Sequence, residues 1–327
     1  MYNKIYVLTP VIPATGGTEL LQQLVFKLRQ FGADAYIYYL DIYEDSPVYT
    51  VFNSHYNNPI ATEIEDKANN VMIVPENAIT YLFKHKRIQK AVWWLSVDNY
   101  KGANMKKSDI FHTVYRCLYD RYVRFVDRKW IHFVQSEYAY IYCTEKRHIL
   151  ADRIFHLSDY LNKTFIESAS SVVPQSRKNQ ILYNPRKGCE FTKKLIQQAS
   201  NLLWIPIQNM SAEEVKNLML ESKIYIDFGN HPGKDRIPRE AAICGMCIIT
   251  GLKGAAGNSV DVAIPAKYKF EENNIDEIIS CINFMLNNFE DVKCDFDLYR
   301  EKIKKEESLF EYEIKRHLMG WNDIEKC

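Results

Sequence analysis

The stretch from Ile224 to Asn258 reads IYIDFGNHPGKDRIPREAAICGMCIITGLKGAAGN, and it decides the fold of the chain. Its apolar runs predict two buried strands, Lys223 to Phe228 and Met246 to Thr250. A basic loop containing glycine and proline, Gly229 to Ile237, follows the first strand, and a Gly-rich loop follows the second. The order of strand, loop, helix and strand is that of a parallel α/β unit, with loops beyond the strand ends.

A helix is expected to begin at Pro238, because a proline at the first helical position needs no N–H partner. The first N–H groups of a helix are unpaired and its dipole is positive there, which favours a phosphate. Lys234, Arg236 and Arg239 crowd this helix start, where acidic residues are the usual choice, so they indicate a bound anion. Glu240 is suited to sugar hydroxyls. The alternative is a solvated basic loop before a core helix.

The α/β pattern occurs in two series along the chain, which predicts two Rossmann-like domains facing each other across a cleft. We expect an N-terminal domain over 1–172 and a C-terminal domain over 173–304, joined by a linker at Val173 to Lys178. The charged helix at about 305–327 is expected to pack back on the N-terminal domain. At 327 residues the chain is long enough for two cores.

The first series opens with a strand, Lys4 to Thr9, a loop, Pro10 to Gly17, and a helix, Thr18 to Phe31. Gly16 and Gly17 would let a ligand approach the backbone at the helix start, although a plain tight turn explains them equally simply. The loop matches neither a dinucleotide fingerprint nor a P-loop.

A second buried strand of this domain, Ala91 to Val97, ends in Asp98 and Asn99. Ligands of open α/β sheets lie beyond the carboxyl ends of the strands, so both side chains are candidates for the cleft. Alternatively, Asp98 caps the turn that follows.

The second series contains a strand at Gln180 to Tyr183 and a basic loop, Asn184 to Gly188. A Ser-x-x-Glu capping box begins a helix at Ser211. We also expect a strand at Val260 to Ile264 and a helix at Ile275 to Asn288.

Composition limits the partners. The 42 Lys and Arg balance 41 Asp and Glu, so no polyanion such as nucleic acid is indicated. Eight scattered cysteines read as reduced thiols of a cytoplasmic protein, and Cys244 and Cys247 as core residues rather than zinc ligands. The sequence shows neither a signal-peptide pattern nor an apolar run long enough to cross a bilayer.

Residues Lys84 to Lys129 contain 12 Lys or Arg against four Asp or Glu, interleaved with aromatic residues. Such a face is typical of proteins that bind an anionic membrane surface at headgroup depth. Single-stranded nucleic acid would also suit it, but no nucleic-acid motif accompanies it. A solvated helix face is the simplest alternative.

These residues resemble glycosyltransferases of the GT-B fold, in particular the family 4 ("glycosyl transferases group 1") enzymes of bacterial polysaccharide and lipopolysaccharide synthesis. Three segments carry the resemblance: Gly16 to Glu19, Tyr183 to Gly188, and Arg239 to Gly245 followed by Ile248 to Thr250. The resemblance covers nearly the whole chain, and its specific part is the second half.

The resemblance implies roles for individual residues. Gly17, with Gly16, would approach the donor phosphates, Arg186 and Lys187 would neutralise the diphosphate, and Glu240 would hold the ribose hydroxyls. The family often has a second Glu eight positions earlier, where this chain has Pro232. The carboxylate expected to contact the donor sugar is therefore missing, and His231, Lys234 or Asp235 are the residues that could replace it.

Mechanistically, we expect no metal, because the only Asp-x-Asp triplet, Asp295 to Asp297, precedes a charged helix near the C-terminus. Lys187, Arg186, Arg236 and the helix N-termini would then stabilise the leaving diphosphate. An inverting enzyme needs a base near the acceptor hydroxyl, and Asp98 is the first candidate, with His112 behind it.

The sequence therefore predicts a metal-independent glycosyltransferase that uses a nucleotide-diphosphate sugar and a glycan or lipid-linked acceptor, in the cytoplasm or at the cytoplasmic membrane face. Two alternatives remain: a nucleotide-sugar epimerase of the same fold, and a non-catalytic nucleotide- or glycan-binding partner of a larger assembly.

Overall fold

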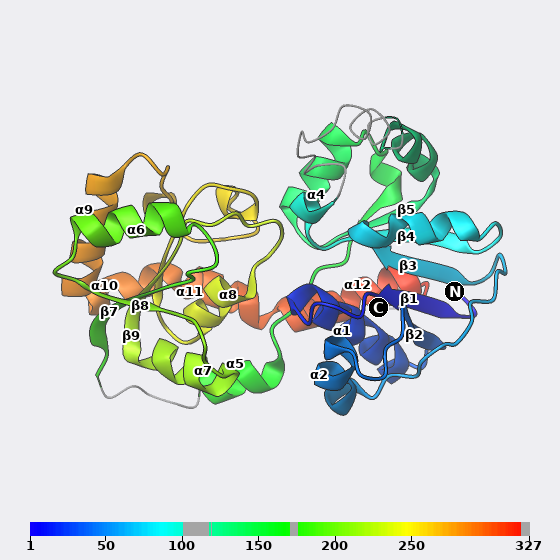
Figure 1. The fold of residues 1–327 in the computed structure, drawn as a ribbon, viewed down its shortest axis with the longest axis horizontal. Coiled ribbons are helices and arrows are strands. Elements are labelled where there is room, and N and C mark those ends of the chain that lie inside the picture. Colours follow the sequence, from blue (N-terminus) through cyan, green and yellow to red (C-terminus); the bar gives the residue numbers. More distant parts are fainter. Residues whose placement is uncertain (101–117, 119, 171–175, 322–327) are drawn as a thin grey trace, which may run out of the picture. The chain divides into compact units, whose positions relative to one another are not determined.

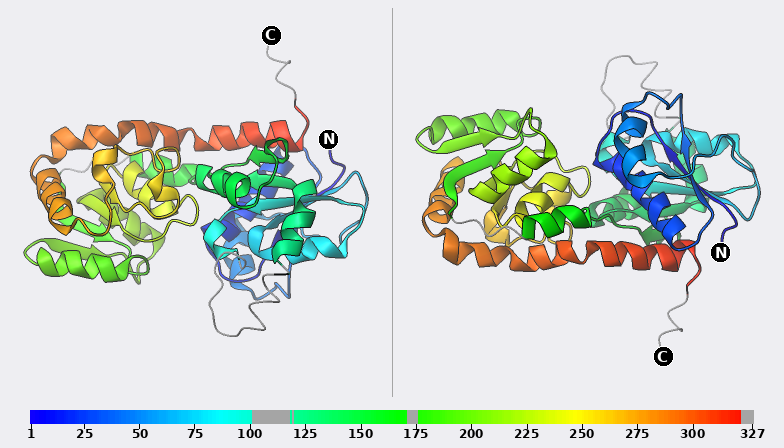
Figure 2. Two further views of the ribbon diagram at one scale, coloured as in Figure 1. Left: turned by 90° about the horizontal axis from the view of Figure 1, so that it is seen from above. Right: turned by 90° about the horizontal axis from the view of Figure 1, so that it is seen from below.

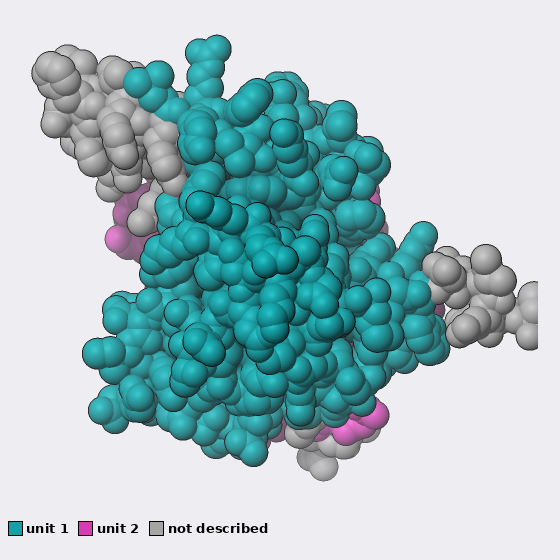
Figure 3. Space-filling view, turned by 90° about the vertical axis from the view of Figure 1, so that its right-hand side faces the viewer, with its two compact units in different colours: residues 1–159, 308–327 teal, residues 160–307 magenta. Residues whose placement is uncertain are grey.

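The computed structural model describes residues 1–100, 118, 120–170 and 176–321. The chain forms two compact units, coloured separately in Figure 3: unit 1 comprises 1–159 and 308–327, and unit 2 comprises 160–307. Across the described ranges, every helix is too short or too polar to span a bilayer.

Unit 1 contains a parallel sheet of six strands in the order β2-β1-β3-β4-β5-β6 (Figure 1). The strands are short, apolar and mostly buried, as a parallel sheet covered on both faces requires. Their bounds are β1 Ile5–Thr9, β2 Ala35–Tyr39, β3 Val71–Pro75, β4 Gln89–Trp94, β5 Ile131–Val134 and β6 Ile154–His156.

Helices cover this sheet. They include α1 Gly16–Gln30, α2 Pro47–Tyr56, α4 Glu137–Ile141 and the final helix α12 Glu306–Leu318. Trp93 and Trp94 are consecutive on β4 and therefore point to opposite faces. Trp93 stacks on Phe310 of α12, with ring centroids 6.2 Å apart, and Trp94 lies in the core of the other face. The aromatic pair thus fixes α12 on one face of the unit 1 sheet (Figure 2).

Unit 2 contains a second parallel sheet, of four strands in the order β10-β9-β7-β8. The strands are β7 Lys178–Tyr183, β8 Leu203–Pro206, β9 Ser222–Asp227 and β10 Cys247–Thr250. The helices are α5 Lys163–Ser170, α6 Cys189–Gln198, α7 Ala212–Glu221, α8 Arg236–Ile243, α9 Ile275–Asn287, α10 Phe289–Val292 and α11 Asp297–Lys304. The predicted α/β class with two parallel sheets is confirmed.

Several local predictions are corrected. Helix α8 begins at Arg236 and not at Pro238, which is its third residue, still within the first turn where a missing N–H breaks no helical bond. The predicted strand at Val260 to Ile264 is wrong. The Asn258 side chain instead accepts the N–H groups of Val260 and Asp261, at 2.9 and 2.7 Å, and holds a turn there.

In the sequence, unit 1 ends at Asp159, and the chain returns to it at Ser308, within α12. The boundary predicted from the sequence lies at residue 172. Helix α5 lies in the polar stretch from which no element was predicted. Contacts of the final helix within unit 1 include Lys27 with Glu311, at 2.6 Å, and Ser158 with Glu313.

The cysteine prediction is confirmed for Cys244 and Cys247. Both thiols are buried in the core of unit 2, and this burial raises the pKa of each to about 12.

Candidate functional site

Loops 184–188 and 229–235 meet at the carboxyl edge of the unit 2 sheet, and two glycines make their approach possible. A Cβ atom on Gly188 would lie 2.6 Å from the carbonyl carbon of Phe228, and its φ of +60° is one that side chains rarely adopt. A Cβ atom on Gly229 would lie 2.4 Å from the Cβ of Lys187. The glycines therefore bring the loop after β7 against the loop after β9.

The third loop of this edge, residues 251–258 after β10, is joined to the second. The N–H of Ala255 donates to the carbonyl oxygen of His231 at 2.8 Å, and a Cβ on Gly254 would lie only 2.0 Å from that oxygen. The Lys269 ammonium donates to two carbonyls of the same loop, at 2.8 and 2.7 Å. Burial lowers the pKa of Lys269 to about 8. Backbone geometry, rather than side-chain packing alone, thus defines this edge.

Two helices begin directly after these loops, α6 at Cys189 and α8 at Arg236. The residue before α6 is Gly188, which has no side chain to cap the helix. The residue before α8 is Asp235, whose carboxylate makes no capping hydrogen bond. Both first turns therefore keep backbone N–H groups that no cap residue takes up, as an anion site needs.

The charged side chains around these termini pair with one another. The Lys187 ammonium is 2.6 Å from Asp235 Oδ2. The Arg236 guanidinium contacts Glu240 Oε1 at 3.0 and 3.2 Å, one helical turn along α8. Both cations remain partly exposed, 31% for Lys187 and 40% for Arg236. The predicted diphosphate and ribose residues are thus gathered at one edge of unit 2.

The other two predicted cations of this stretch are buried. Lys234 Nζ and Arg239 Nη1 contact the two carboxylate oxygens of Glu306, at 2.9 and 2.7 Å. Arg239 also donates to the backbone oxygens of Lys234 and Asp235. Lys234 could bind a ligand only by breaking this buried pair, so its observed role is to hold the loop.

The remaining predicted residues are distributed as follows. Arg186 is exposed at the tip of its loop, whose turn is closed by the Asn184 side chain at 3.0 Å. Asp98 lies after β4 in unit 1 and accepts a hydrogen bond from the Tyr138 hydroxyl at 3.0 Å. His112 lies outside the described residues.

Gly16 and Gly17 form the first turn of α1 rather than the preceding loop. A Cβ atom on Gly17 would meet nothing closer than 3.9 Å. Such a Cβ would make ordinary van der Waals contacts with the Thr15 and Leu95 side chains, so the packing of unit 1 does not require glycine at this position.

Glu306 and Asp227 are not among the predicted site residues, and His231 is named only as a possible contact of the donor sugar. Glu306 lies 67 positions beyond its partner Arg239, and Asp227 reads as the polar end of a buried strand. His231 is fully buried between the carboxylates of Asp227 and Asp235. Only the unusual number of charges in a Gly- and Pro-rich loop could have indicated a paired cluster.

The Asp-x-Asp triplet is engaged elsewhere. The carboxylate of Asp295 accepts the Tyr268 hydroxyl and pairs with Lys267 at 2.8 Å, and Asp297 pairs with Arg300 at 2.7 Å. Phe296 between them is buried in the unit 2 core. Each of the two carboxylates is therefore already paired with a basic side chain.

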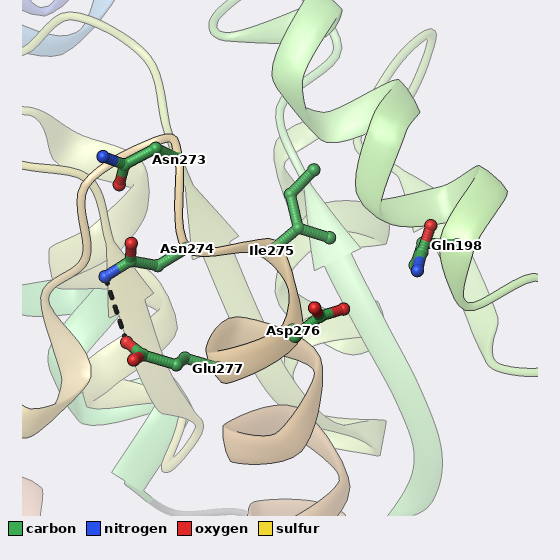
Figure 4. Close-up of a pocket in the computed structure, with 6 residues that line it drawn as sticks. All are labelled: Gln198, Asn273, Asn274, Ile275, Asp276 and Glu277. Carbon is green, nitrogen blue, oxygen red and sulfur yellow. Dashed lines mark hydrogen bonds between the residues drawn. The ribbon is translucent and has the colours of Figure 1, made fainter.

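A pocket of about 460 Å³ lies elsewhere in unit 2 (Figure 4). Its lining is polar, and Asn274 donates to Glu277 across it at 3.0 Å. Six residues line it: Gln198, Asn273, Asn274, Ile275, Asp276 and Glu277. This pocket contains none of the predicted site residues.

Neither a family model nor a curated protein matches this sequence. Solved structures do match over the full length. A glycosyltransferase from Rickettsia africae superposes with a TM-score of 0.68 at 13% identity, covering 99% of both chains. HepE from Anabaena, in complex with UDP-glucose, gives 0.64 at 11% identity, covering 97% of this chain and 100% of HepE. A sucrose-phosphate synthase from Thermosynechococcus elongatus gives 0.63 at 13% identity, covering 97% of each chain.

These likenesses extend over both units, so they concern the architecture of the whole chain. At such low identity they establish the fold and nothing more specific. The chain has the GT-B fold of two Rossmann-like domains, which confirms the fold predicted from its sequence.

Proposed function

We propose that this chain is a glycosyltransferase that transfers a sugar from a nucleotide-diphosphate sugar to a glycan or lipid-linked acceptor in bacterial surface polysaccharide synthesis. One observation carries the proposal. In a chain of GT-B fold, Lys187, Arg236 and Glu240 surround two helix N-termini whose first turns have no side-chain cap. HepE, which shares the fold, was solved with UDP-glucose bound.

The chemistry follows from charge. As the bond between the sugar and the diphosphate breaks, negative charge grows on the leaving phosphate. Lys187, Arg186 and Arg236, with the N–H groups of α6 and α8, are placed to stabilise that charge electrostatically and without a metal. Glu240 would accept hydrogen bonds from the ribose hydroxyls. Releasing Arg236 for the phosphate leaves this carboxylate available for the sugar.

Unit 1 would supply the acceptor side. Gly16 and Gly17 begin α1, where glycine lets the donor phosphates approach the backbone closely. Asp98 would act as the base towards the acceptor hydroxyl in an inverting reaction, with the Tyr138 hydroxyl orienting the carboxylate. Asp235 is the candidate to contact the donor sugar, because it is the partly exposed carboxylate nearest in sequence to Pro232.

The test separates binding from turnover. Glu240→Ala should weaken nucleotide binding by about 10- to 100-fold, as expected for a lost hydrogen bond to a charged group. Lys187→Ala should lower kcat by about 100-fold or more, because it acts on the transition state. Lys193→Ala, an exposed cation of α6, is the matched control and should change neither. Full activity of both site variants would refute the assignment.

The same assays distinguish the alternatives. Conversion of the donor with no acceptor present would indicate an epimerase, and binding without transfer across an acceptor panel would indicate a non-catalytic partner. A thermal-shift panel of nucleotide sugars comes first, because a ligand that binds only the folded state raises the melting temperature.

We also propose that unit 1 contacts an anionic membrane at the cytoplasmic face. Leu118, Tyr122 and Phe125 have helical spacing, residues 120–126 are helical, and the three side chains are 63%, 55% and 71% exposed. Exposed cations flank them, at Arg121, Arg128 and Lys129. Apolar anchors between basic residues suit anionic headgroups.

Sedimentation with vesicles tests the membrane proposal. Phe125→Ser should reduce binding to vesicles that contain anionic lipid, and added salt should weaken the binding of the unchanged protein. Leu298→Ser, which alters a still more exposed apolar residue in unit 2, is the control. Failure of the unchanged protein to bind anionic vesicles at low salt would overturn this proposal and leave the glycosyltransferase proposal intact.

A further inference from the structure

His231 is completely buried at the carboxyl edge of the unit 2 sheet, between two carboxylates. Its Nε2 lies 3.4 Å from Asp227 Oδ1 and its Nδ1 lies 3.2 Å from Asp235 Oδ2. Neither contact is aligned well enough to be a hydrogen bond, so the attraction is mainly electrostatic. Both ring nitrogens therefore face negative charge and are shielded from bulk solvent.

The inner carboxylate of this arrangement is ionised. Burial acts to raise the pKa of Asp227, but contact with His231, the N–H of Gly229 and the Tyr225 hydroxyl together hold it below its usual value. The last two groups donate to the carboxylate at 2.9 Å each. Asp227 thus remains negative although it is almost completely buried.

The outer carboxylate is shared. Asp235 Oδ2 contacts Nδ1 of His231 on one side and the Lys187 ammonium, at 2.6 Å, on the other. Four groups therefore follow one another from the sheet to the surface: Asp227, His231, Asp235 and Lys187. If the imidazole is charged, the signs alternate along this series, and the net charge is zero.

The charge on His231 can be argued from its surroundings. A neutral imidazole has one N–H and one lone pair, so one of its nitrogens would direct a lone pair at a carboxylate. Only the imidazolium has a proton on both nitrogens, and so a positive charge between the two carboxylates. The groups that face the ring are Asp227 from β9, Asp235 from its own loop and, beyond Asp235, Lys187 from the loop after β7.

His132 in unit 1 shows the opposite environment. It is also fully buried, but its Nδ1 accepts the Trp94 indole N–H at 3.0 Å and its Nε2 lies 2.9 Å from the carbonyl oxygen of Asp127. One acceptor and one donor suit the neutral ring, and burial lowers the pKa of His132 to about 4. The chain thus contains two buried histidines for which the contacts predict opposite charges.

We propose that His231 is a charged positioning residue that holds Asp235 from behind and so directs the Lys187 ammonium towards the donor diphosphate. The kinetic part of this inference rests on the proposed function. With a neutral side chain in place of His231, Asp235 would pair with Lys187 alone and hold it more tightly. Lys187 would then be less available to the developing charge on the leaving phosphate.

The ligand atoms of Asp227, His231 and Asp235 lie within 4.8 Å of one another, a spacing that would also suit a divalent cation. The contacts favour the ion-pair chain for two reasons. The two carboxylates face different nitrogens of the ring, and the Lys187 ammonium already lies against Asp235. A metal that bound at this place would have to displace a cation from its partner.

The closing experiment begins with nitrogen NMR of the histidine side chains in the unliganded protein, which needs no substrate. We expect both ring nitrogens of His231 to carry a proton, while His132 shows one protonated and one bare nitrogen. Loss of the signals in His231→Asn assigns them, and Asp227→Asn, which should perturb them, assigns them if the first variant does not fold. A neutral His231 ring overturns the inference, and so does a ring whose signals shift on addition of Zn²⁺ or Mn²⁺ and recover with chelator.

Kinetics then test the positioning role. His231→Asn should lower kcat by about tenfold or more and leave the KM for the donor within about threefold, because Lys187 acts mainly on the transition state. A rise in KM with unchanged kcat would contradict this role. If the unchanged protein transfers no sugar yet shows a charged His231, the proposed function fails and the charge assignment stands.

Discussion

Replacing Glu306 by Gln tests whether the buried ion cluster Lys234–Glu306–Arg239 holds the basic loop in place. The side chains of all three residues are at most 8% exposed, and the carboxylate contacts one cation with each oxygen. Gln keeps the size and shape of the side chain but removes its charge. The two cations then remain buried without a counter-charge at this position, while Arg239 keeps its hydrogen bonds to backbone oxygens.

The magnitude follows from burial. Removing one partner of a buried ion pair costs about 3–5 kcal/mol, because an uncompensated charge remains in the interior. With a urea dependence of about 2 kcal/mol per molar, that cost moves the unfolding midpoint of unit 2 down by about 1.5–2.5 M. Because Arg239 also holds the backbone of Lys234 and Asp235, nucleotide affinity should fall as well.

Urea unfolding, combined with hydrogen exchange of the α8 amides, measures the effect in unit 2 separately from unit 1. Glu301→Gln is the matched control, since Glu301 makes an exposed pair with Lys304 in the preceding helix, and it should stay within about 0.5 kcal/mol. A Glu306→Gln protein as stable as this control would refute the reasoning, because the cluster would then be hydrated and not buried.

Three further predictions concern single positions. Gly254→Ala should destabilise unit 2 by more than about 2 kcal/mol, because its Cβ would lie 2.0 Å from the His231 carbonyl oxygen; Gly32→Ala, at a similar positive φ but with nothing within 4 Å, should cost only about 1 kcal/mol in urea unfolding. Burial lowers the pKa of His132 from 6.5 to about 4, so its contribution to the stability of unit 1 is present above pH 6.5 and is lost as the pH falls towards 4. The loss amounts to up to about 3 kcal/mol. In His132→Gln, the free energy of unfolding of unit 1 should depend less on pH over this range. Glu76 behaves in the opposite sense, because burial raises its pKa from 4.5 to about 7: its stabilising contribution is lost as pH rises through 7, and Glu76→Gln should gain up to about 3 kcal/mol on the unchanged protein between pH 4.5 and 8.

Much of the fold could be predicted because its strands are buried on both faces and therefore appear as uninterrupted apolar runs. Strands β1, β7, β9 and β10 begin and end within two residues of the predicted bounds. The capping box at Ser211 and Glu214 is present as predicted, because it depends only on neighbours three residues apart. The segment Val260 to Ile264 is the opposite case. Its apolar composition suits a strand, but one side chain, Asn258, bends the backbone into a turn.

The candidate site could be predicted only in part, because some of its contacts join residues that lie far apart in the sequence. Sequence spacing shows that Lys234, Arg236 and Arg239 lie near a helix start, but it does not show which of them is neutralised by a residue far along the chain. Glu306 pairs with Lys234 and Arg239, whereas Arg236 pairs with Glu240. Nothing near Glu306 in the sequence marks it as the partner of Lys234 and Arg239. Burial of His231 is hidden for the same reason, since it arises from the contact of three loops.

Exposure decides which cations of this edge can serve a ligand. The pairs Lys187–Asp235 and Arg236–Glu240 are partly exposed, and such pairs are worth about 0–1 kcal/mol, so an arriving diphosphate can replace either carboxylate at little cost. The Lys234–Glu306–Arg239 cluster is buried, and opening it costs several times more. These four cations are therefore neutralised while the site is empty, and of the four, Lys187 and Arg236 can be released readily. The same reasoning applies to Asp235, whose carboxylate is shared by His231 and Lys187. A counter-charge divided between two cations attracts each of them less strongly than it would attract one. Lys187 is therefore held in position by Asp235 but can leave it for a phosphate.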